Sequence, residues 1–303
     1  MKSVCYSSFD LLEKFYQKDN KVNILLYCMD KLRFGTCGIP LSTTKKGTSE
    51  GINKVKELNL DAMELEFVRS VYIKKEIAPE IKEQAKNKDI ILTCHAPYFI
   101  NLNSEDKKKF YASIGYIKNS AIITSLCGGY SVCFHAGYYM KQDPKKVYER
   151  IKEGLKIIIK EVNEFDKKIW IRPETSGKIS QFGTIHEILD LSLEFDNVLP
   201  CIDWSHLHAF TNGKNNSSEE FREVLTLVEK KLGRKALDNV HFHCQGVEYT
   251  EKGERKHLNL KESDLKYEEL LKTWKEFKIK GVVIAESPNV EEDALLLKKL
   301  YGK

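Results

Sequence analysis

The feature of this sequence that most constrains its fold is a set of eight short apolar or alternating runs, spread evenly along 303 residues. Short runs that mix β-branched and aromatic residues are typical of buried strands. Their starts lie roughly 30 to 40 residues apart, which is the span of one strand–helix unit with its loops. The predicted strands are Leu32–Thr36, Ala62–Phe67, Ile90–His95, Ser131–His135, Ile169–Glu174, Val198–Asp203, Asn239–His243 and Gly281–Glu286.

The segments between these runs carry apolar residues three and four positions apart, which is the period of an amphipathic helix. Examples are Val147–Val162, Ile185–Phe195 and Phe221–Leu232, and Ser217 is placed to cap the last of them. Eight strand–helix units predict an α/β protein, a closed (β/α)8 TIM barrel. An open doubly wound sheet is the alternative, but the first strand is not followed by the three glycines of a nucleotide-binding loop.

The barrel is predicted to occupy residues 31–303 as one domain, and residues 1–30 form an N-terminal extension whose structure the sequence leaves open. No apolar run reaches about 18 residues, so no membrane span is expected. Eight scattered cysteines without a CxxC pair indicate reduced thiols in a cytoplasmic protein. The net charge of +5 permits a polyanionic partner without requiring one.

Residues that can bind metal ions end six consecutive predicted strands. Active sites of TIM barrels gather at the carboxyl ends of the strands. One such residue alone more often caps a helix or meets a lysine, but six at one rim favour a metal site. The candidate ligands are His95, His135, Glu174, Asp203, His243 and Glu286, with His206 and His257 following in the adjoining loops.

Eight ligands exceed the four that one Zn²⁺ ion usually takes, so the set indicates two or three ions, with Mn²⁺ as the other candidate metal. Glu174 lies on a central strand and is the predicted bridge, because its two oxygens can serve two ions. Such a site suits displacement at phosphorus, where ions lower the pKa of water and neutralise phosphate oxygens. His241 shares a strand face with His243 and is the alternative ligand there.

Four cysteines lie close to these ligands in the sequence. Neighbouring strand residues point to opposite faces, so these cysteines are expected to pack against the helices and not to bind metal. They are Cys94, Cys133, Cys201 and Cys244.

Short motifs at the strand ends resemble those of one known family. They read CHAPYFINL at 94–102, FHAG at 134–137, ETSG at 174–177, CIDWSH at 201–206, HFHCQG at 241–246 and AESP at 285–288. In this order and spacing they resemble the endonuclease IV family of apurinic/apyrimidinic DNA endonucleases, over about Leu32 to Leu300. The resemblance implies a xylose-isomerase-like barrel with three zinc ions. It also implies incision of the phosphodiester 5′ to an abasic nucleotide, leaving a 3′-hydroxyl.

The resemblance also implies a distribution of the ligands. His95, His135 and Glu174 hold the first ion, Glu174, Asp203, His243 and Glu286 the second, and His206 and His257 the third. Glu286 and Glu174 are the implied catalytic residues, with Glu286 orienting the attacking hydroxide. One departure is clear, because the family's Asp-x-His is here Arg255-Lys-His257, which leaves the third ion without its carboxylate. Glu254 is the candidate substitute.

Double-stranded DNA containing abasic sites is the implied partner, and no nucleotide cofactor or membrane is expected. Tyr98 and Phe99 follow His95 where the family inserts a wedge into the duplex, and an abasic site is cheaper to flip out than an intact nucleotide. Arg69, just past the second strand, is a candidate phosphate contact. A monomer is expected, because the strand-end face must admit a duplex.

Two other functions remain open. A sugar isomerase or epimerase would use one divalent ion, for which Glu174, Asp203, His243 and Glu286 suffice. The additional histidines at 95, 135 and 257 favour the nuclease. A metal-stabilised DNA-binding protein without turnover is the third alternative, because the family's aspartate is missing.

Overall fold

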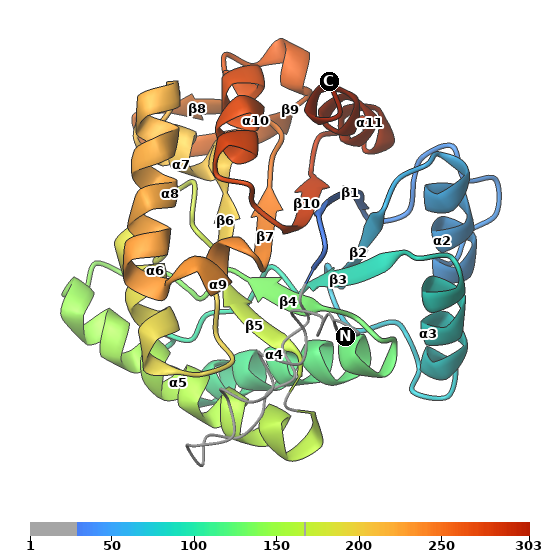
Figure 1. Ribbon diagram of the computed structural model, residues 1–303. Coiled ribbons are helices and arrows are strands. Elements are labelled where there is room, and N and C mark those ends of the chain that lie inside the picture. The colour runs from blue at the N-terminus through green and yellow to red at the C-terminus, as the bar shows by residue number, and fades with distance from the viewer. Residues whose placement is uncertain (1–28, 167) are drawn as a thin grey trace, which may run out of the picture.

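Eight parallel strands form the centre of the computed structural model, which describes residues 29–166 and 168–303 (Figure 1). They are β1 (Leu32–Cys37), β2 (Ala62–Glu66), β3 (Ile91–His95), β4 (Ser131–Phe134), β5 (Trp170–Pro173), β6 (Cys201–Asp203), β7 (Val240–His243) and β10 (Gly281–Ala285). Their hydrogen-bonded order is β5-β4-β3-β2-β1-β10-β7-β6. Parallel bridges from Ile171 to Val198 and from Glu174 to Cys201 close the gap between β5 and β6. The predicted TIM barrel is therefore confirmed.

Helices surround this barrel in the order that the sequence predicts (Figure 1). They are α2 (Thr48–Glu57), α3 (Ala78–Asn87), α4 (Lys107–Leu126), α5 (Pro144–Phe165), α6 (Ile185–Glu194), α7 (Trp204–Phe210), α8 (Ser218–Leu232), α9 (Arg234–Leu237), α10 (Tyr267–Glu276) and α11 (Glu291–Tyr301). Ser217 caps α8 by accepting a hydrogen bond from the backbone N–H of Glu220, as the sequence predicts. None of the described helices is long and apolar enough to cross a membrane.

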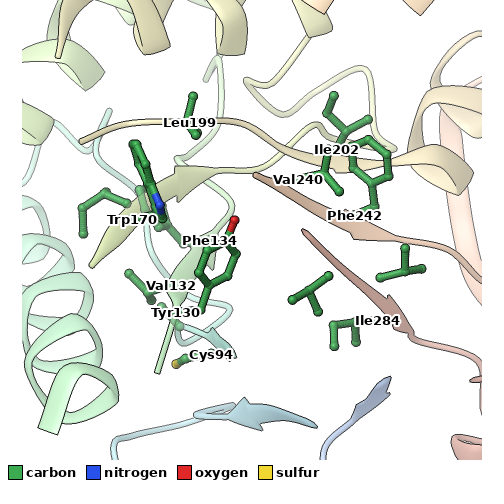
Figure 2. Packing of buried hydrophobic residues seen from close by; sticks show 14 of the residues in the cluster. Cys94, Tyr130, Val132, Phe134, Trp170, Leu199, Ile202, Val240, Phe242 and Ile284 are labelled. Atoms are coloured by element: carbon green, nitrogen blue, oxygen red, sulfur yellow. The ribbon is translucent and has the colours of Figure 1, made fainter. Parts of the chain in front are cut away.

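The apolar core lies between the barrel and its helices. Figure 2 shows part of it, including Val132 and Phe134 of β4 and Phe242 of β7. Alternate residues of a strand point to opposite faces. The residues between these apolar ones therefore face the inside of the barrel, where the site is built.

The inside of the barrel is polar at positions that in TIM barrels are usually filled by Val, Ile and Leu. Its fully buried residues include Glu64 on β2, Cys133 on β4, Cys201 on β6 and two histidines on β7, His241 and His243.

The expectation that all four cysteines pack against the helices is wrong for two of them. Cys133 and Cys201 each lie two residues before a predicted ligand, so they share its face, and Cys133 Sγ lies 3.8 Å from His243 Nε2. Cys94 and Cys244 are adjacent to ligands and do lie in the apolar core. The six described cysteines are all free thiols.

A β-hairpin follows β7 and consists of β8 (Gly246–Thr250) and β9 (Gly253–Leu258). Its register shifts between Glu248 and Tyr249, since Glu248 pairs with Lys256 whereas Tyr249 pairs with Glu254. Arg255 is thus an extra residue on β9, a β-bulge. The predicted N-terminal extension lies outside the described residues except for Met29 and Asp30.

Candidate metal centre

Glu174 is the central residue of the candidate site. It follows β5 directly, is fully buried, and has two imidazoles facing each of its carboxylate oxygens. Oε2 lies 3.2 Å from His95 Nε2 and 3.7 Å from His135 Nε2. Oε1 lies 3.1 Å from His243 Nδ1 and 3.4 Å from His206 Nδ1. One carboxylate therefore joins side chains from four different strand ends.

Three histidines of the site have one ring nitrogen held by a backbone carbonyl. Nδ1 of His95 lies 2.7 Å from the carbonyl oxygen of Ala96, Nδ1 of His206 lies 3.0 Å from that of Thr175, and Nδ1 of His257 lies 3.1 Å from that of Glu286. A carbonyl can only accept, so Nδ1 carries a hydrogen, and in the neutral ring the lone pair is on Nε2. Nε2 is therefore the nitrogen through which each of these rings can bind a metal ion.

A second group gathers at the ends of β5, β6, β7 and β10. The ligand atoms of Glu174, Asp203, His243 and Glu286 all lie within 4.8 Å of one another. Asp203 is fixed from two directions, because its Oδ1 accepts from the backbone N–H of His206 at 2.7 Å and its Oδ2 accepts from Gln245 Nε2 at 2.7 Å. The four side chains are buried.

The third group consists of His206, Glu254 and His257, whose ligand atoms also lie within 4.8 Å of one another. Oε2 of Glu254 lies 3.5 Å from His206 Nε2, and its Oε1 lies 3.5 Å from His257 Nε2. Residues three apart on a regular strand point to opposite faces of the sheet. Because Arg255 is an extra residue in β9, Glu254 and His257 lie on the same face. Arg255 itself points outward and pairs with Glu248.

The pKa values reflect a crowded, buried mixture of acids and imidazoles. Burial alone would lower the pKa of His95, but the contact with Glu174 outweighs it and raises that pKa to about 10. Burial lowers the pKa of His135 to about 4. Burial raises the pKa of Glu286 to about 7, and burial together with the charge of Glu64 raises that of Glu66 to about 7. The neighbouring His135 and His243 hold the pKa of Glu174 well below its usual range against the effect of burial.

The donor set fits divalent metal ions of the zinc type. Zn²⁺ prefers imidazole nitrogen and carboxylate oxygen in groups of three or four. Nδ1 of His135 and Nε2 of His206 are buried and have no hydrogen-bond partner among the described residues. Unpaired buried nitrogens are costly unless something binds them. The predicted first set is arranged differently in detail: the groups whose ligand atoms lie within 4.8 Å of one another are His95 with Cys133 and Glu174, and His135 with Glu174 and His206.

The predicted DNA-contacting residues lie at the mouth of the barrel. Tyr98 and Phe99 are half exposed, at 47% and 50%. The Tyr98 ring lies 4.9 Å from that of His95 and its hydroxyl donates to Glu66 Oε2 at 3.4 Å, while the Phe99 ring packs edge-on against Tyr116. Arg69 is exposed in the loop after β2.

Sequence reasoning missed three residues of the site. Glu64 and Glu66 lie on β2, and Gln245 lies just after β7. The alternating run AMELEF carried the signal for the first two, because both acids fall on the face opposite to the apolar residues. His208 belongs to none of these groups, because its Nε2 lies 3.0 Å from Asp264 Oδ1.

The fold is that of a TIM barrel with a cluster of imidazoles and carboxylates at its strand ends, and residues 52–300 match the xylose isomerase-like TIM barrel family. The chain belongs to this family. An uncharacterized protein of Methanocaldococcus jannaschii is 42% identical over 90% of this chain and 97% of its own length. A probable endonuclease 4 of Mycoplasma genitalium is 23% identical over 65% of this chain and 67% of its own length.

Solved structures with the same fold include proteins of different activities. A D-tagatose 3-epimerase-like protein is similar with a TM-score of 0.68 and 20% identity, over 88% of this chain and 96% of its own. Endonuclease IV from Thermus thermophilus is similar with a TM-score of 0.67 and 17% identity, over 88% of this chain and 97% of its own. At such identities the likeness shows the fold, and the choice between activities depends on the site.

Proposed function

We propose that this protein is a zinc-dependent endonuclease that hydrolyses the DNA phosphodiester 5′ to abasic sites and leaves a 3′-hydroxyl. The observation that carries the proposal is the environment of Glu174, whose two oxygens each face two imidazoles. Glu174, His95, His135, Asp203, His243 and Glu286 are six candidate ligands around this carboxylate, and Zn²⁺ usually takes four, so one ion cannot use all of them. A carboxylate at the centre of surplus ligands suits a bridge between two ions.

Three ions can be assigned to the described side chains. Glu174 with His95 and His135 would hold the first, and Glu174 with Asp203, His243 and Glu286 the second. His206 and His257 would hold the third, and Glu254 supplies the carboxylate that the family pattern places two residues before the last histidine. Bound ions would lower the pKa of a water molecule and neutralise the phosphate oxygens.

Glu286 is the candidate residue for proton transfer. Its Oε1 lies 3.5 Å from His243 Nδ1, and burial raises its pKa to about 7. A carboxyl group with this pKa can accept and release a proton near neutral pH. Glu286 is therefore suited to accept the proton of the attacking water, and Glu174 is suited to bridge two metal ions.

The surface around the barrel mouth supports a polyanionic substrate. Exposed basic residues occur in loops that follow β1, β2, β4 and α7 and in the β8–β9 hairpin. They are Lys45, Lys46, Arg69, Lys74, Lys75, Lys141, Lys214, Arg255 and Lys256. Phosphate contacts of this kind position a duplex without reading its sequence. Tyr98 and Phe99 are half exposed and the Tyr98 ring lies 4.9 Å from that of His95, so this pair is the candidate for an intercalating wedge.

A ketose epimerase is the second candidate. The set Glu174, Asp203, His243 and Glu286 suffices for one ion, and a D-tagatose 3-epimerase-like protein shares the fold. This activity has no use for the group of His206, Glu254 and His257. The exposed lysines and arginines around the barrel mouth are likewise not needed to bind a neutral sugar.

The experiment is incision of a labelled duplex that carries one tetrahydrofuran abasic analogue. The expected result is a single cut on the 5′ side of the analogue, suppressed by EDTA and restored by Zn²⁺. The Glu174→Gln variant should lose the cut. Glu291→Gln, which alters a buried glutamate whose carboxylate accepts from the backbone N–H groups of Leu41 and Ser42, should retain it. Binding of the duplex without any cut would contradict the proposal, as would an intact duplex together with epimerised ketose.

A further inference from the structure

His243 differs from the other metal-facing histidines in the way its ring is held. His95, His206 and His257 each place Nδ1 against a backbone carbonyl and turn Nε2 toward a glutamate of the candidate metal centre. His243 lies on β7 inside the barrel and is turned the other way, with Nδ1 3.1 Å from Glu174 Oε1. Its Nε2 points down into the barrel, 3.1 Å from Glu64 Oε1.

Glu64 is held in place by other groups on its second oxygen. Oε2 accepts from Thr93 Oγ1 at 2.8 Å, lies 3.0 Å from His241 Nε2, and has Cys133 Sγ at 3.6 Å. These contacts turn Oε1 toward His243. The carboxylate is fully buried, so its position depends on these neighbours and not on solvent.

His241 completes the chain of contacts below Glu64. Its Nδ1 lies 2.9 Å from Ser131 Oγ, and the hydroxyl can donate to that nitrogen. Nε2 then carries the hydrogen that faces Glu64.

Both ring nitrogens of His243 face a carboxylate, Nε2 that of Glu64 and Nδ1 that of Glu174, each at 3.1 Å. A carboxylate only accepts, so both nitrogens can carry a hydrogen in the metal-free protein. When the ring gives up one hydrogen to bind a metal ion and Glu64 retains the one on Nε2, the lone pair is on Nδ1, which faces Glu174 and Glu286.

We propose that Glu64 is a positioning residue that fixes His243 in the tautomer whose Nδ1 faces the metal centre, with Ser131 and His241 orienting Glu64. The inference rests only on the metal-binding part of the proposed function and not on the reaction. Carboxylates that accept from a metal-binding histidine orient its ring and raise its basicity. Here a buried side chain on β2 does for His243 what backbone carbonyls do for His95, His206 and His257.

The competing arrangement is a metal ion inside the barrel. Ligand atoms of Cys133, Cys201, His241 and His243 lie within 4.8 Å of one another. Such an ion would take Nε2 of His243 and so exclude the hydrogen that Glu64 requires. The two arrangements are therefore mutually exclusive.

The test is the long-range ¹H–¹⁵N spectrum of zinc-loaded protein labelled with ¹⁵N-histidine. The expected result is a metal-bound Nδ1 and a protonated Nε2 for His243, with the opposite assignment for His95, His206 and His257. A protonated Nδ1 at His243 would overturn the proposal, and this measurement needs no variant. The zinc content of the sample separates the two failures. A protein that binds no zinc would refute the proposed function, whereas a zinc-loaded protein with a protonated Nδ1 at His243 would refute this inference alone.

Variants and cobalt substitution extend the test. Glu64→Gln should change the His243 signals, weaken metal binding by roughly 10 to 100-fold and lower kcat with little change in KM. Glu291→Gln is the matched control, because it changes a buried glutamate that accepts from the backbone N–H groups of Leu41 and Ser42, and it should change none of these. Unchanged His243 signals and metal affinity in Glu64→Gln would refute the role. A thiolate-to-cobalt charge-transfer band in the Co²⁺ protein, together with a metal-bound Nε2 at His243, would place the ion among the cysteines and refute it as well.

Discussion

At the scale of single residues, Glu254 determines whether the outermost ligand group has a carboxylate. It lies 3.5 Å from both His206 and His257, although the position that the family pattern gives to aspartate is occupied by Arg255. Two neutral imidazoles leave both positive charges of a divalent ion uncompensated, and one carboxylate neutralises half of that charge.

The first prediction concerns this carboxylate. Glu254→Gln should lower the zinc content from three ions per chain to two, because the amide is uncharged and a weaker ligand. Affinity for the lost ion should fall at least about tenfold. Zinc content after gel filtration at limiting free Zn²⁺ measures the change. Arg255→Ala is the control, because Arg255 points outward to Glu248, and it should keep three ions. Three ions in Glu254→Gln would show that this carboxylate is not a ligand.

The second prediction concerns protons. Contact with Glu174 outweighs burial and raises the pKa of His95 to about 10, so the metal-free protein holds this imidazole protonated at pH 7. A ligand nitrogen must lose its hydrogen before it binds, so zinc uptake at pH 7 should release about one proton from this group and weaken as the pH falls. Calorimetric titration in two buffers of different ionisation enthalpy counts the protons. His95→Ala should release about one fewer, and heats that are equal in both buffers would contradict the assignment.

At the scale of elements, the β8–β9 hairpin delivers Glu254 and His257 to the site. Gly253 begins β9 with a φ of +89°, and a Cβ there would lie 2.1 Å from the carbonyl oxygen of Gly177. The backbone N–H of Glu254 donates to the same carbonyl at 2.8 Å. The hairpin therefore docks on the loop after β5 through a contact that only glycine permits.

The third prediction follows from this contact. Gly253→Ala should displace the hairpin and weaken the third ion while leaving the other two, and it should lower stability by at least about 1–3 kcal/mol. Zinc content and thermal unfolding measure the two effects. Gly233→Ala is the matched control, because Gly233 has a φ of +78° with nothing within 4 Å of its added Cβ. Gly233→Ala should lower stability without any loss of zinc. Loss of an ion in this control would show that the weaker zinc binding of Gly253→Ala is not specific to the hairpin.

The strand ends could be predicted from the sequence, but the hairpin could not. His95 and His243 end runs whose apolar pattern marks a strand, and parallel strands of a barrel bring such ends to one rim. Glu254 was only a candidate because a bulge changes which residues share a face, and no sequence pattern near Arg255 signals one. Glu64 was missed because a charged residue inside a barrel is unusual and becomes explicable only beside His241 and His243.

At the scale of the whole molecule, the barrel brings residues separated by up to 191 positions, from His95 to Glu286, to one centre. Six consecutive strand ends and one hairpin contribute candidate ligands. The same fold serves epimerases and endonucleases, so the number of ions that the mouth holds separates the two activities more directly than the fold does.

The most direct measurement of the central claim is anomalous diffraction at the zinc absorption edge from crystals of the zinc-loaded protein. Three peaks are expected around Glu174, one of them between His206, Glu254 and His257. A single peak among Glu174, Asp203, His243 and Glu286 would contradict the multi-ion centre and leave the one-ion epimerase as the better account.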